Sequence, residues 1–319
     1  MLVATLLLLL GFAILIKGAD FLVNGASSAA KKYGISNLAI GLTVVAFGTS
    51  MPELIVSLLA AANGQNDASF GNVIGSNNFN LLFILGVAGI IYPLTVQKNT
   101  VSYEVPISMA AALLLFILIN DVIIWDSESN ILGRMDSIIL LLFFSGFMIY
   151  IYRTMNQTND EGESQIKIYS MPLSLGMIGI GMVMLIGGGK LVVDNAIEIA
   201  HYFELSEKLI GLTILAAGTS LPELATSAVA AYRKNTDIAI GNVVGSNIFN
   251  ILFILAITGL VNPITYNPSM NFDMYVLLGS TLLLIIFMFT LRKRKLDRWE
   301  AVIFLIGYFA YTWYLVSID

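Results

Sequence analysis

Hydrophobic residues along this chain gather in runs long enough to cross a lipid bilayer, separated by short polar connectors. A helix needs about 20 mostly apolar residues to cross about 30 Å of hydrocarbon. The pattern predicts ten such helices, five in each half of the chain. They lie near residues 2–16, 37–62, 70–91, 105–119, 131–152, 171–189, 207–231, 238–261, 274–291 and 299–318. We therefore expect an all-α membrane protein.

The composition agrees with a membrane protein and excludes several other classes. Hydrophobic residues make up 57% of the chain and charged residues 12%, whereas soluble domains have about 25% charged residues. Without cysteine and with His201 as its one histidine, the chain offers no zinc site of the usual type. It contains no His-Glu-x-x-His or Gly-x-Ser-x-Gly motif, so we do not expect an enzyme. The lipid bilayer is the expected environment, with neither nucleic acid nor an obligate protein partner.

The basic residues are divided unequally between the two sides of the predicted membrane. When connectors are assigned alternately, one side holds all of the sixteen lysines and arginines except Arg134, Lys190 and Lys208. Cytoplasmic connectors are enriched in Lys and Arg, so the basic side is expected to be cytoplasmic. This assignment places both termini outside and the polar linker 153–170 in the cytoplasm.

The chain contains the same two polar blocks twice, 170 positions apart. Gly41–Leu54 returns as Gly211–Leu224, and Gly71–Asn80 returns as Gly241–Asn250. Because five helices separate the copies, the second copy enters the membrane from the opposite face, as in transporters built from inverted repeats. We expect three segments: a first five-helix repeat at 1–152, the cytoplasmic linker 153–170 and a second five-helix repeat at 171–319.

Each block places a glutamate inside an apolar segment. An ionisable side chain within a membrane helix is expensive and therefore indicates function, and neither Glu53 nor Glu223 has a Lys or Arg near it in sequence. Pro52 and Pro222 precede these glutamates and are expected to break the helices, because proline lacks the N–H group. The carbonyl groups of Gly48 and Gly218, four residues back, and those near Ala46 and Ala216 would then be free to face a cavity.

The polar residues around each break supply only oxygen ligands. Thr49 and Ser50 lie within one turn of Glu53, and Ser76 and Asn80 share one face of the next helix. The second copy provides Thr219, Ser220, Ser246 and Asn250. Such a set suits a hard cation, and an irregular shell built from two halves favours calcium over magnesium. Inversion of the repeats would bring Glu53 to face Glu223 near the midplane of the membrane.

Some polar residues of the blocks have two interpretations. Asn72, Asn77, Asn242 and Asn247 could be ligands or could be hydrogen-bond partners between helices.

The doubled Gly-Thr-Ser-x-Pro-Glu and Gly-Ser-Asn motifs resemble the cation/calcium exchanger superfamily, and within it the prokaryotic sodium/calcium exchangers. This resemblance implies alternating access, in which the first helix of each repeat slides across the other eight. It implies no cofactor, with Ca²⁺ and Na⁺ as the transported ions. The calcium site would comprise Glu53, Glu223, Thr49 and Thr219, and the sodium sites would draw on Ala46, Ser50, Ser76, Ala216, Ser220 and Ser246. Asn80 and Asn250 occupy the remaining central positions.

The expected function is a sodium-driven calcium antiporter in the plasma membrane of a prokaryote. The alternative is a proton/calcium antiporter, whose typical motif is Gly-Asn-Ala-x-Glu. A cation channel is a more distant alternative, because it needs a continuous pore. Asn250 departs from relatives that carry Asp at this position, including potassium-dependent exchangers, and this argues against potassium cotransport. It leaves two central carboxylates, so the ion stoichiometry stays open.

Overall fold

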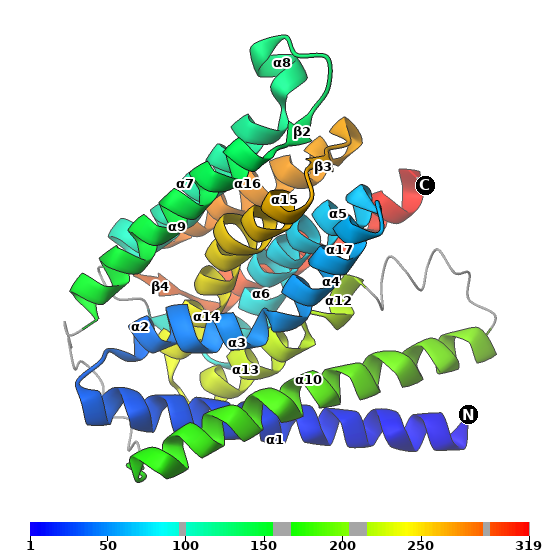
Figure 1. The fold of residues 1–319 in the computed structure, drawn as a ribbon. Helices are drawn as coiled ribbons and strands as arrows, with labels where there is room; N and C mark the ends of the chain where they lie inside the picture. The colour runs from blue at the N-terminus through cyan, green and yellow to red at the C-terminus, as the bar shows by residue number, and fades with distance from the viewer. Residues whose placement is uncertain (96–99, 156–166, 204–215, 290–293, 319) are drawn as a thin grey trace.

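Helices account for nearly all of the structure, a computed structural model that describes residues 1–95, 100–155, 167–203, 216–289 and 294–318 (Figure 1). The first half of the chain forms α1 (Leu2–Tyr33), α2 (Asn37–Ile40), η1 (Gly41–Val45), α3 (Ala46–Thr49), α4 (Met51–Ala62), α5 (Asn66–Asn78), η2 (Phe79–Ile84), α6 (Leu85–Ile91), β1 (Leu94–Thr95), η3 (Thr100–Glu104), α7 (Val105–Ile119), α8 (Asp121–Trp125), β2 (Ile131–Leu132) and α9 (Arg134–Thr154). The second half forms α10 (Met171–Tyr202), α12 (Ala216–Gly218), α13 (Leu221–Tyr232), α14 (Thr236–Phe249), η5 (Asn250–Leu255), α15 (Ala256–Val261), β3 (Ile264–Thr265), η6 (Pro268–Met270), α16 (Asn271–Phe287), β4 (Lys295–Leu296) and α17 (Arg298–Ile318).

The first helix of each half is much longer than predicted. Both α1 and α10 have 32 residues, so the predicted ends at residues 16 and 189 are wrong. Polar residues do not interrupt either helix because small side chains on the same stretches pack closely, and α1 continues until Gly34, which adopts φ 66°. At 1.5 Å per residue each helix is about 48 Å long, which exceeds the roughly 30 Å hydrocarbon core of a bilayer. Lys17 and Lys190 accordingly lie within helices and not in connectors.

The helices α1 and α10 pack against each other along their length and cross beneath the rest of the bundle (Figure 1). Glycines allow this close approach. A Cβ atom on Gly18 would lie 2.8 Å from Met184 Cβ, and one on Gly181 would lie 2.7 Å from Leu22 N. The pair therefore forms one unit that contacts the remaining helices through a smaller area.

Two helices form the centre of the bundle, and each carries five buried polar residues. Thr236–Val261 and Asn66–Ile91 are the most buried of the long apolar helices, whereas the outer helices are mostly exposed. Each central helix contains a π-helical segment, η2 and η5, which begins at the end of the Gly-Ser-Asn block. Such wide turns often occur at functional sites.

Two short antiparallel strand pairs join connectors from different halves of the chain. Leu94 pairs with Leu296 in β1–β4, and Ile131 pairs with Thr265 in β2–β3. Their positions in Figure 1 are far apart, so each pair ties the halves together at a different end of the bundle.

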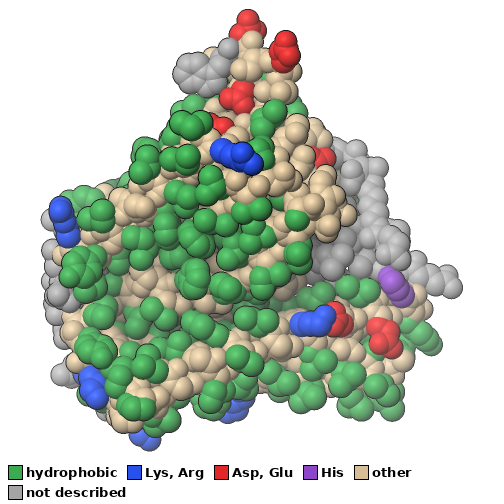
Figure 2. All heavy atoms as spheres, in the orientation of Figure 1, with side chains coloured by type: hydrophobic (Ala, Val, Ile, Leu, Met, Phe, Trp, Pro, Cys, Tyr) green, Lys and Arg blue, Asp and Glu red, His purple; other side chains and the backbone are tan. Residues whose placement is uncertain are grey.

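The chain is an all-α membrane protein with multiple membrane-spanning helices. Within the described residues, eight helices are long and apolar enough to cross a bilayer, and Asn37–Thr49 with Met51–Ala62 forms a bent pair that adds a ninth. The predicted helix 207–231 lies partly outside the described residues, as does part of the predicted linker 153–170. Figure 2 shows hydrophobic side chains covering the visible face of the bundle, as expected for contact with lipid.

Candidate cation site

Both copies of the Gly-Thr-Ser-x-Pro-Glu motif lie at a break in a helix. The axes of the bent pair that meets at Ser50 differ by 46°. Ser50 adopts φ −84° and ψ 8° between α3 and α4, and Ser220 adopts φ −90° and ψ 8° between α12 and α13. Pro52 and Pro222 occupy the first turn of α4 and α13. N–H groups in the first turn make no hydrogen bond within the helix, so proline is tolerated there. The motif's glutamates therefore lie at helix N-termini, which favour negative charge.

The Ala46 carbonyl group is not free of helix bonds, contrary to the sequence prediction. It accepts a hydrogen bond from Ser50 N at 3.0 Å, and Thr49 Oγ1 lies 3.2 Å from it. The physical reason is the position of Pro52, which begins a new helix and leaves the last turn of α3 intact. Ala216 begins α12, and the residues before it lie outside the described part of the chain.

Glu53 accepts hydrogen bonds from both halves of the chain. Ser220 Oγ lies 2.8 Å from Glu53 Oε1, and Ser76 Oγ lies 3.5 Å from the same oxygen. The Ser220 hydroxyl is also 3.0 Å from Ser76 Oγ. One carboxylate and two hydroxyl groups from α4, α5 and the α12–α13 break thus converge.

Glu223 has the mirrored environment. Ser50 Oγ donates to Glu223 Oε1 at 2.8 Å, and Ser246 Oγ lies 3.5 Å from that oxygen. These distances equal those around Glu53. The two sequence copies therefore produce two clusters of the same geometry, each completed by a serine from the other half.

The threonines of the two motifs contact asparagines from the opposite half. Thr49 Oγ1 donates to Asn242 Oδ1 at 3.0 Å, and Asn242 Nδ2 donates to Glu223 O at 3.2 Å and Ser227 Oγ at 2.9 Å. The other copy has the same three bonds: Thr219 Oγ1 to Asn72 Oδ1 at 3.2 Å, Asn72 Nδ2 to Glu53 O at 3.1 Å and Asn72 Nδ2 to Ser57 Oγ at 2.9 Å. The asparagines link the broken helices to α5 and α14.

Four further asparagines connect the central helices where they cross. Asn80 Nδ2 donates to Asn247 Oδ1 at 3.0 Å, and Asn250 Nδ2 donates to Asn77 Oδ1 at 2.9 Å. Asn77 Nδ2 and Asn247 Nδ2 each donate to the other residue's backbone carbonyl oxygen, at 3.3 Å and 3.4 Å. Asn77 and Asn247 are therefore hydrogen-bond partners between helices, one of the two roles that the sequence allowed.

Several buried oxygens of these residues have no hydrogen-bond partner in the described part of the chain. They are Glu53 Oε2, Glu223 Oε2, Asn80 Oδ1 and Asn250 Oδ1. Buried polar atoms in proteins are nearly always hydrogen-bonded, so each exception requires an explanation. Buried carboxylate and amide oxygens that lack donors are suited to a hard cation.

The charge of the site points to the same conclusion. Glu53 and Glu223 are each 1% exposed, and none of the ion pairs within the described residues includes them. An uncompensated buried carboxylate is costly, so two in one region require neutralisation by a bound cation or by protons. Within the described residues no group of three or more His, Cys, Asp or Glu side chains could hold a metal ion. Hydroxyl and amide oxygens would have to complete any shell.

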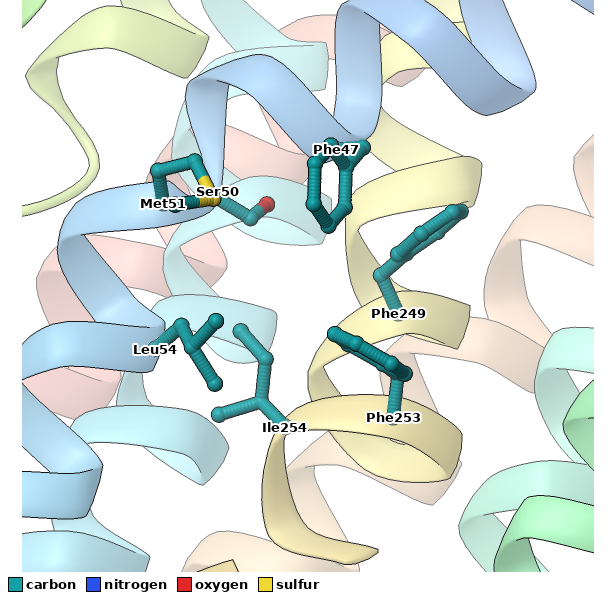
Figure 3. A pocket seen from close by; sticks show the side chains of 7 residues that line it. All are labelled: Phe47, Ser50, Met51, Leu54, Phe249, Phe253 and Ile254. Carbon is teal, nitrogen blue, oxygen red and sulfur yellow. The ribbon is translucent and has the colours of Figure 1, made fainter. Parts of the chain in front are cut away.

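An apolar pocket adjoins the site on one side (Figure 3). Ser50 is the one polar side chain among those that line it, and its hydroxyl also donates to Glu223. The other lining residues are Phe47, Met51, Leu54, Phe249, Phe253 and Ile254. Ser50 is 2% exposed whereas Phe47 is 41% exposed, so the pocket lies between the surface and the site.

The sequence prediction identified the glutamates and serines but not the network that holds them. Ser57 and Ser227 were not considered, although they match at the same offset of 170 positions and accept bonds from Asn72 and Asn242. Identity between the copies was the available signal. The π-helical segments had no signal in the hydrophobic pattern, because a single wide turn leaves the pattern of a long apolar helix unchanged.

A family model described as sodium/calcium exchanger protein matches residues 3–153 and 173–317. Among curated relatives, the inner membrane protein YrbG of Escherichia coli is 36% identical over 84% of this chain and 83% of its own. The sodium/calcium exchanger MaX1 of Methanosarcina acetivorans is 32% identical over 96% of each chain.

The fold also matches solved structures of a sodium–calcium exchanger. The structure of NCX_Mj soaked with zero Na⁺ and Ca²⁺ superposes with a TM-score of 0.83 at 31% identity, covering 100% of this chain and 99% of the other. NCX_Mj soaked with 2.5 mM Na⁺ and 0.1 mM Ca²⁺ gives a TM-score of 0.82 at 32% identity, covering 97% of each chain.

Proposed function

Because this chain belongs to the sodium/calcium exchanger protein family, we propose that it is a secondary antiporter that exchanges sodium for calcium across a membrane. The observation that carries this proposal is the set of buried, unpartnered oxygens on Glu53, Glu223, Asn80 and Asn250. They lie in the two matched blocks, and serine hydroxyl groups contact both carboxylates. A cation would satisfy them together.

The ion assignments are those that the resemblance to this family implies. Ca²⁺ would bind between Glu53 and Glu223, together with Thr49 and Thr219, and its two positive charges would cancel the two carboxylates. Sodium ions would use the flanking oxygens of Ser50, Ser76, Ser220, Ser246 and the carbonyl groups of Ala46 and Ala216. Calcium is favoured because it accepts six to eight oxygen ligands in irregular geometry.

Competition between the ions follows from the shared carboxylates. Each carboxylate contacts a serine of the other half at 2.8 Å, so the calcium ligands and the flanking sodium ligands are the same or adjacent groups. Both ions cannot be fully bound together. Alternating exposure of this one site to the two sides of the membrane would couple sodium entry to calcium exit, or the reverse.

The proposed architecture is ten transmembrane helices in two inverted five-helix repeats, 1–152 and 171–319. The mirrored bonds around the two glutamates support it, because equal distances recur at an offset of 170 positions. Inverted repeats joined by a midplane site are typical of secondary transporters.

The proposed location is the plasma membrane of a prokaryote, with both termini outside and the linker 153–170 in the cytoplasm. The distribution of lysine and arginine supports this orientation. The relatives from Escherichia coli and Methanosarcina acetivorans support the prokaryotic setting.

The test is uptake of ⁴⁵Ca²⁺ into proteoliposomes loaded with sodium. Uptake that requires an outward sodium gradient, and that stops when the gradient is collapsed, supports the proposal. Uptake that follows a pH gradient and ignores sodium would indicate a proton/calcium antiporter instead. Unitary currents in a planar bilayer would indicate a channel.

A further inference from the structure

We propose that Asn77 and Asn247 are positioning residues, which determine that the Asn250 and Asn80 amides face the cation with oxygen and not with NH₂. This inference deepens the proposed function and rests on it, because it concerns the same site. Asn77 and Asn247 themselves are 0% exposed and their side-chain oxygens are already occupied by hydrogen bonds.

The orientation of an asparagine amide matters at a cation site. The oxygen end accepts and can bind a cation, whereas the NH₂ end only donates and repels one. The two ends are nearly equal in size, so packing around the amide does not choose between them. Hydrogen bonds must make that choice.

The backbone provides the fixed starting point for the choice. Asn77 Nδ2 lies 3.3 Å from the backbone oxygen of Asn247, and Asn247 Nδ2 lies 3.4 Å from that of Asn77. A backbone carbonyl group can only accept a hydrogen bond, so the side-chain amides of Asn77 and Asn247, called the outer amides below, must turn their NH₂ groups toward it. The oxygen of each outer amide is then directed to its other neighbour.

The side-chain amides of Asn80 and Asn250, the inner amides, are oriented by the outer amides. Asn77 Oδ1 accepts from Asn250 Nδ2 at 2.9 Å, and Asn247 Oδ1 accepts from Asn80 Nδ2 at 3.0 Å. Turning either inner amide around would place two oxygens against each other. The opposite ends, Asn80 Oδ1 and Asn250 Oδ1, are the buried oxygens that have no partner in the described part of the chain.

A simple role in joining the helices makes a different prediction. If the Asn77 hydrogen bonds only joined α5 to α14, replacing Asn77 by alanine would weaken ion binding equally whatever residue occupied position 250. If Asn77 orients the Asn250 amide, its removal matters only while position 250 has two unlike ends. A carboxylate has two equivalent acceptors and needs no orientation.

The experiment is a double-mutant cycle measured by calcium titration of the purified full-length protein in detergent. Asn77→Ala is expected to raise the Kd for Ca²⁺ five- to tenfold when position 250 is asparagine. In the Asn250→Asp background, where Asn77 Oδ1 would face a carboxylate oxygen, the same change is expected not to raise the Kd. The mirrored cycle, Asn247→Ala with Asn80→Asp, gives the same pattern and decides the matter if one variant fails to fold.

The matched control is Asn78→Ala, the adjacent residue on α5. Asn78 is also 0% exposed, but its Nδ2 donates to Asp273 O and not to a residue of the site. Its removal should leave the Kd within twofold of wild type. Equal weakening by Asn77→Ala in both backgrounds, or by Asn78→Ala, would overturn the positioning role. Wild-type protein that binds no Ca²⁺ would instead contradict the proposed function, and the positioning role with it.

Discussion

Ser50 and Glu223 are 173 positions apart in the chain, yet Ser50 Oγ donates a 2.8 Å hydrogen bond to Glu223 Oε1. The matching contact runs from the second half of the chain to the first: Ser220 Oγ donates to Glu53 Oε1, also at 2.8 Å. Each carboxylate therefore depends on a hydroxyl group from the other half of the chain. Neither half contains a complete site.

Replacement of Ser50 or Ser220 by alanine should destabilise the calcium-free protein. Each change leaves a buried carboxylate oxygen without its closest donor, and a hydrogen bond to a charged group contributes about 1.5–3 kcal/mol. We expect the apparent melting temperature in detergent to fall by similar amounts in both variants. Saturating Ca²⁺ should reduce the difference from wild type, because the ion binds the folded state and satisfies the carboxylate.

The control for this pair is Ser145→Ala, an exposed hydroxyl that donates to Leu141 O within α9. It should leave the melting temperature nearly unchanged. Equal losses for all three serines, or losses that Ca²⁺ does not reduce, would show that the two site hydroxyl groups do not support the carboxylates.

The sequence singled out residues that the structure brings together, because polar residues in membrane helices are few. Glu53 and Glu223 were conspicuous within apolar segments, and the repeated blocks marked their neighbours. The failure concerned backbone geometry. Pro52 predicted a broken helix. In the structure Pro52 lies in the first turn of α4, and the Ala46 carbonyl group stays hydrogen-bonded. This arrangement depends on how the chain bends at Ser50, which the sequence does not show.

Alanine at Gly181 should separate α1 from α10. A Cβ atom there would lie 2.7 Å from Leu22 N and 2.8 Å from Gly18 O, and backbone atoms cannot move aside as a flexible side chain can. Overpacking of this kind costs about 1–3 kcal/mol. We expect a lower melting temperature and slower calcium uptake. Gly179→Ala on the same helix is the control, because no atom of the described residues lies within 4 Å of its new Cβ.

The opposite result would also be informative about α1 and α10. If Gly181→Ala and Gly179→Ala gave the same melting temperature and uptake rate, the close approach of the two helices would not contribute to stability or transport.

Asp20 on α1 and Arg233, which follows α13, form an ion pair that fastens the α1–α10 unit to the central helices. A bond from Asn235 Nδ2 to Ser27 Oγ at 3.0 Å lies beside it. Since both charged side chains are partly exposed, their coupling should be modest, about 0.2–1 kcal/mol. In a double-mutant cycle, Asp20→Asn and Arg233→Gln together should destabilise no more than either alone.

The control for this cycle is the Lys190–Asp194 pair on α10, whose side chains are 77% and 56% exposed. Replacing Lys190 or Asp194 singly should destabilise the protein only slightly, and the two losses of stability should add in the double variant. Additive losses at Asp20 and Arg233 as well would show that their contact contributes nothing to stability.

The fold was predictable in outline because hydrophobic runs fix where helices can cross a bilayer. The lengths of α1 and α10 were not predictable in this way. The sequence assigned Lys17 to a connector after residue 16. In the structure Lys17 is an exposed residue within α1, and Asp20 on the same helix pairs with Arg233.

The central claim is that Glu53 and Glu223 jointly bind the transported calcium. The most direct measurement is the initial rate of sodium-driven ⁴⁵Ca²⁺ uptake for Glu53→Gln, Glu223→Gln and the control Glu104→Gln, a glutamate that is equally well buried but accepts from Tyr150 OH outside the site. Loss of one member of a buried ionic set costs about 3–5 kcal/mol, or roughly a hundredfold or more in affinity. We predict background uptake for both site variants and near wild-type uptake for Glu104→Gln. Wild-type uptake by either site variant would contradict the account.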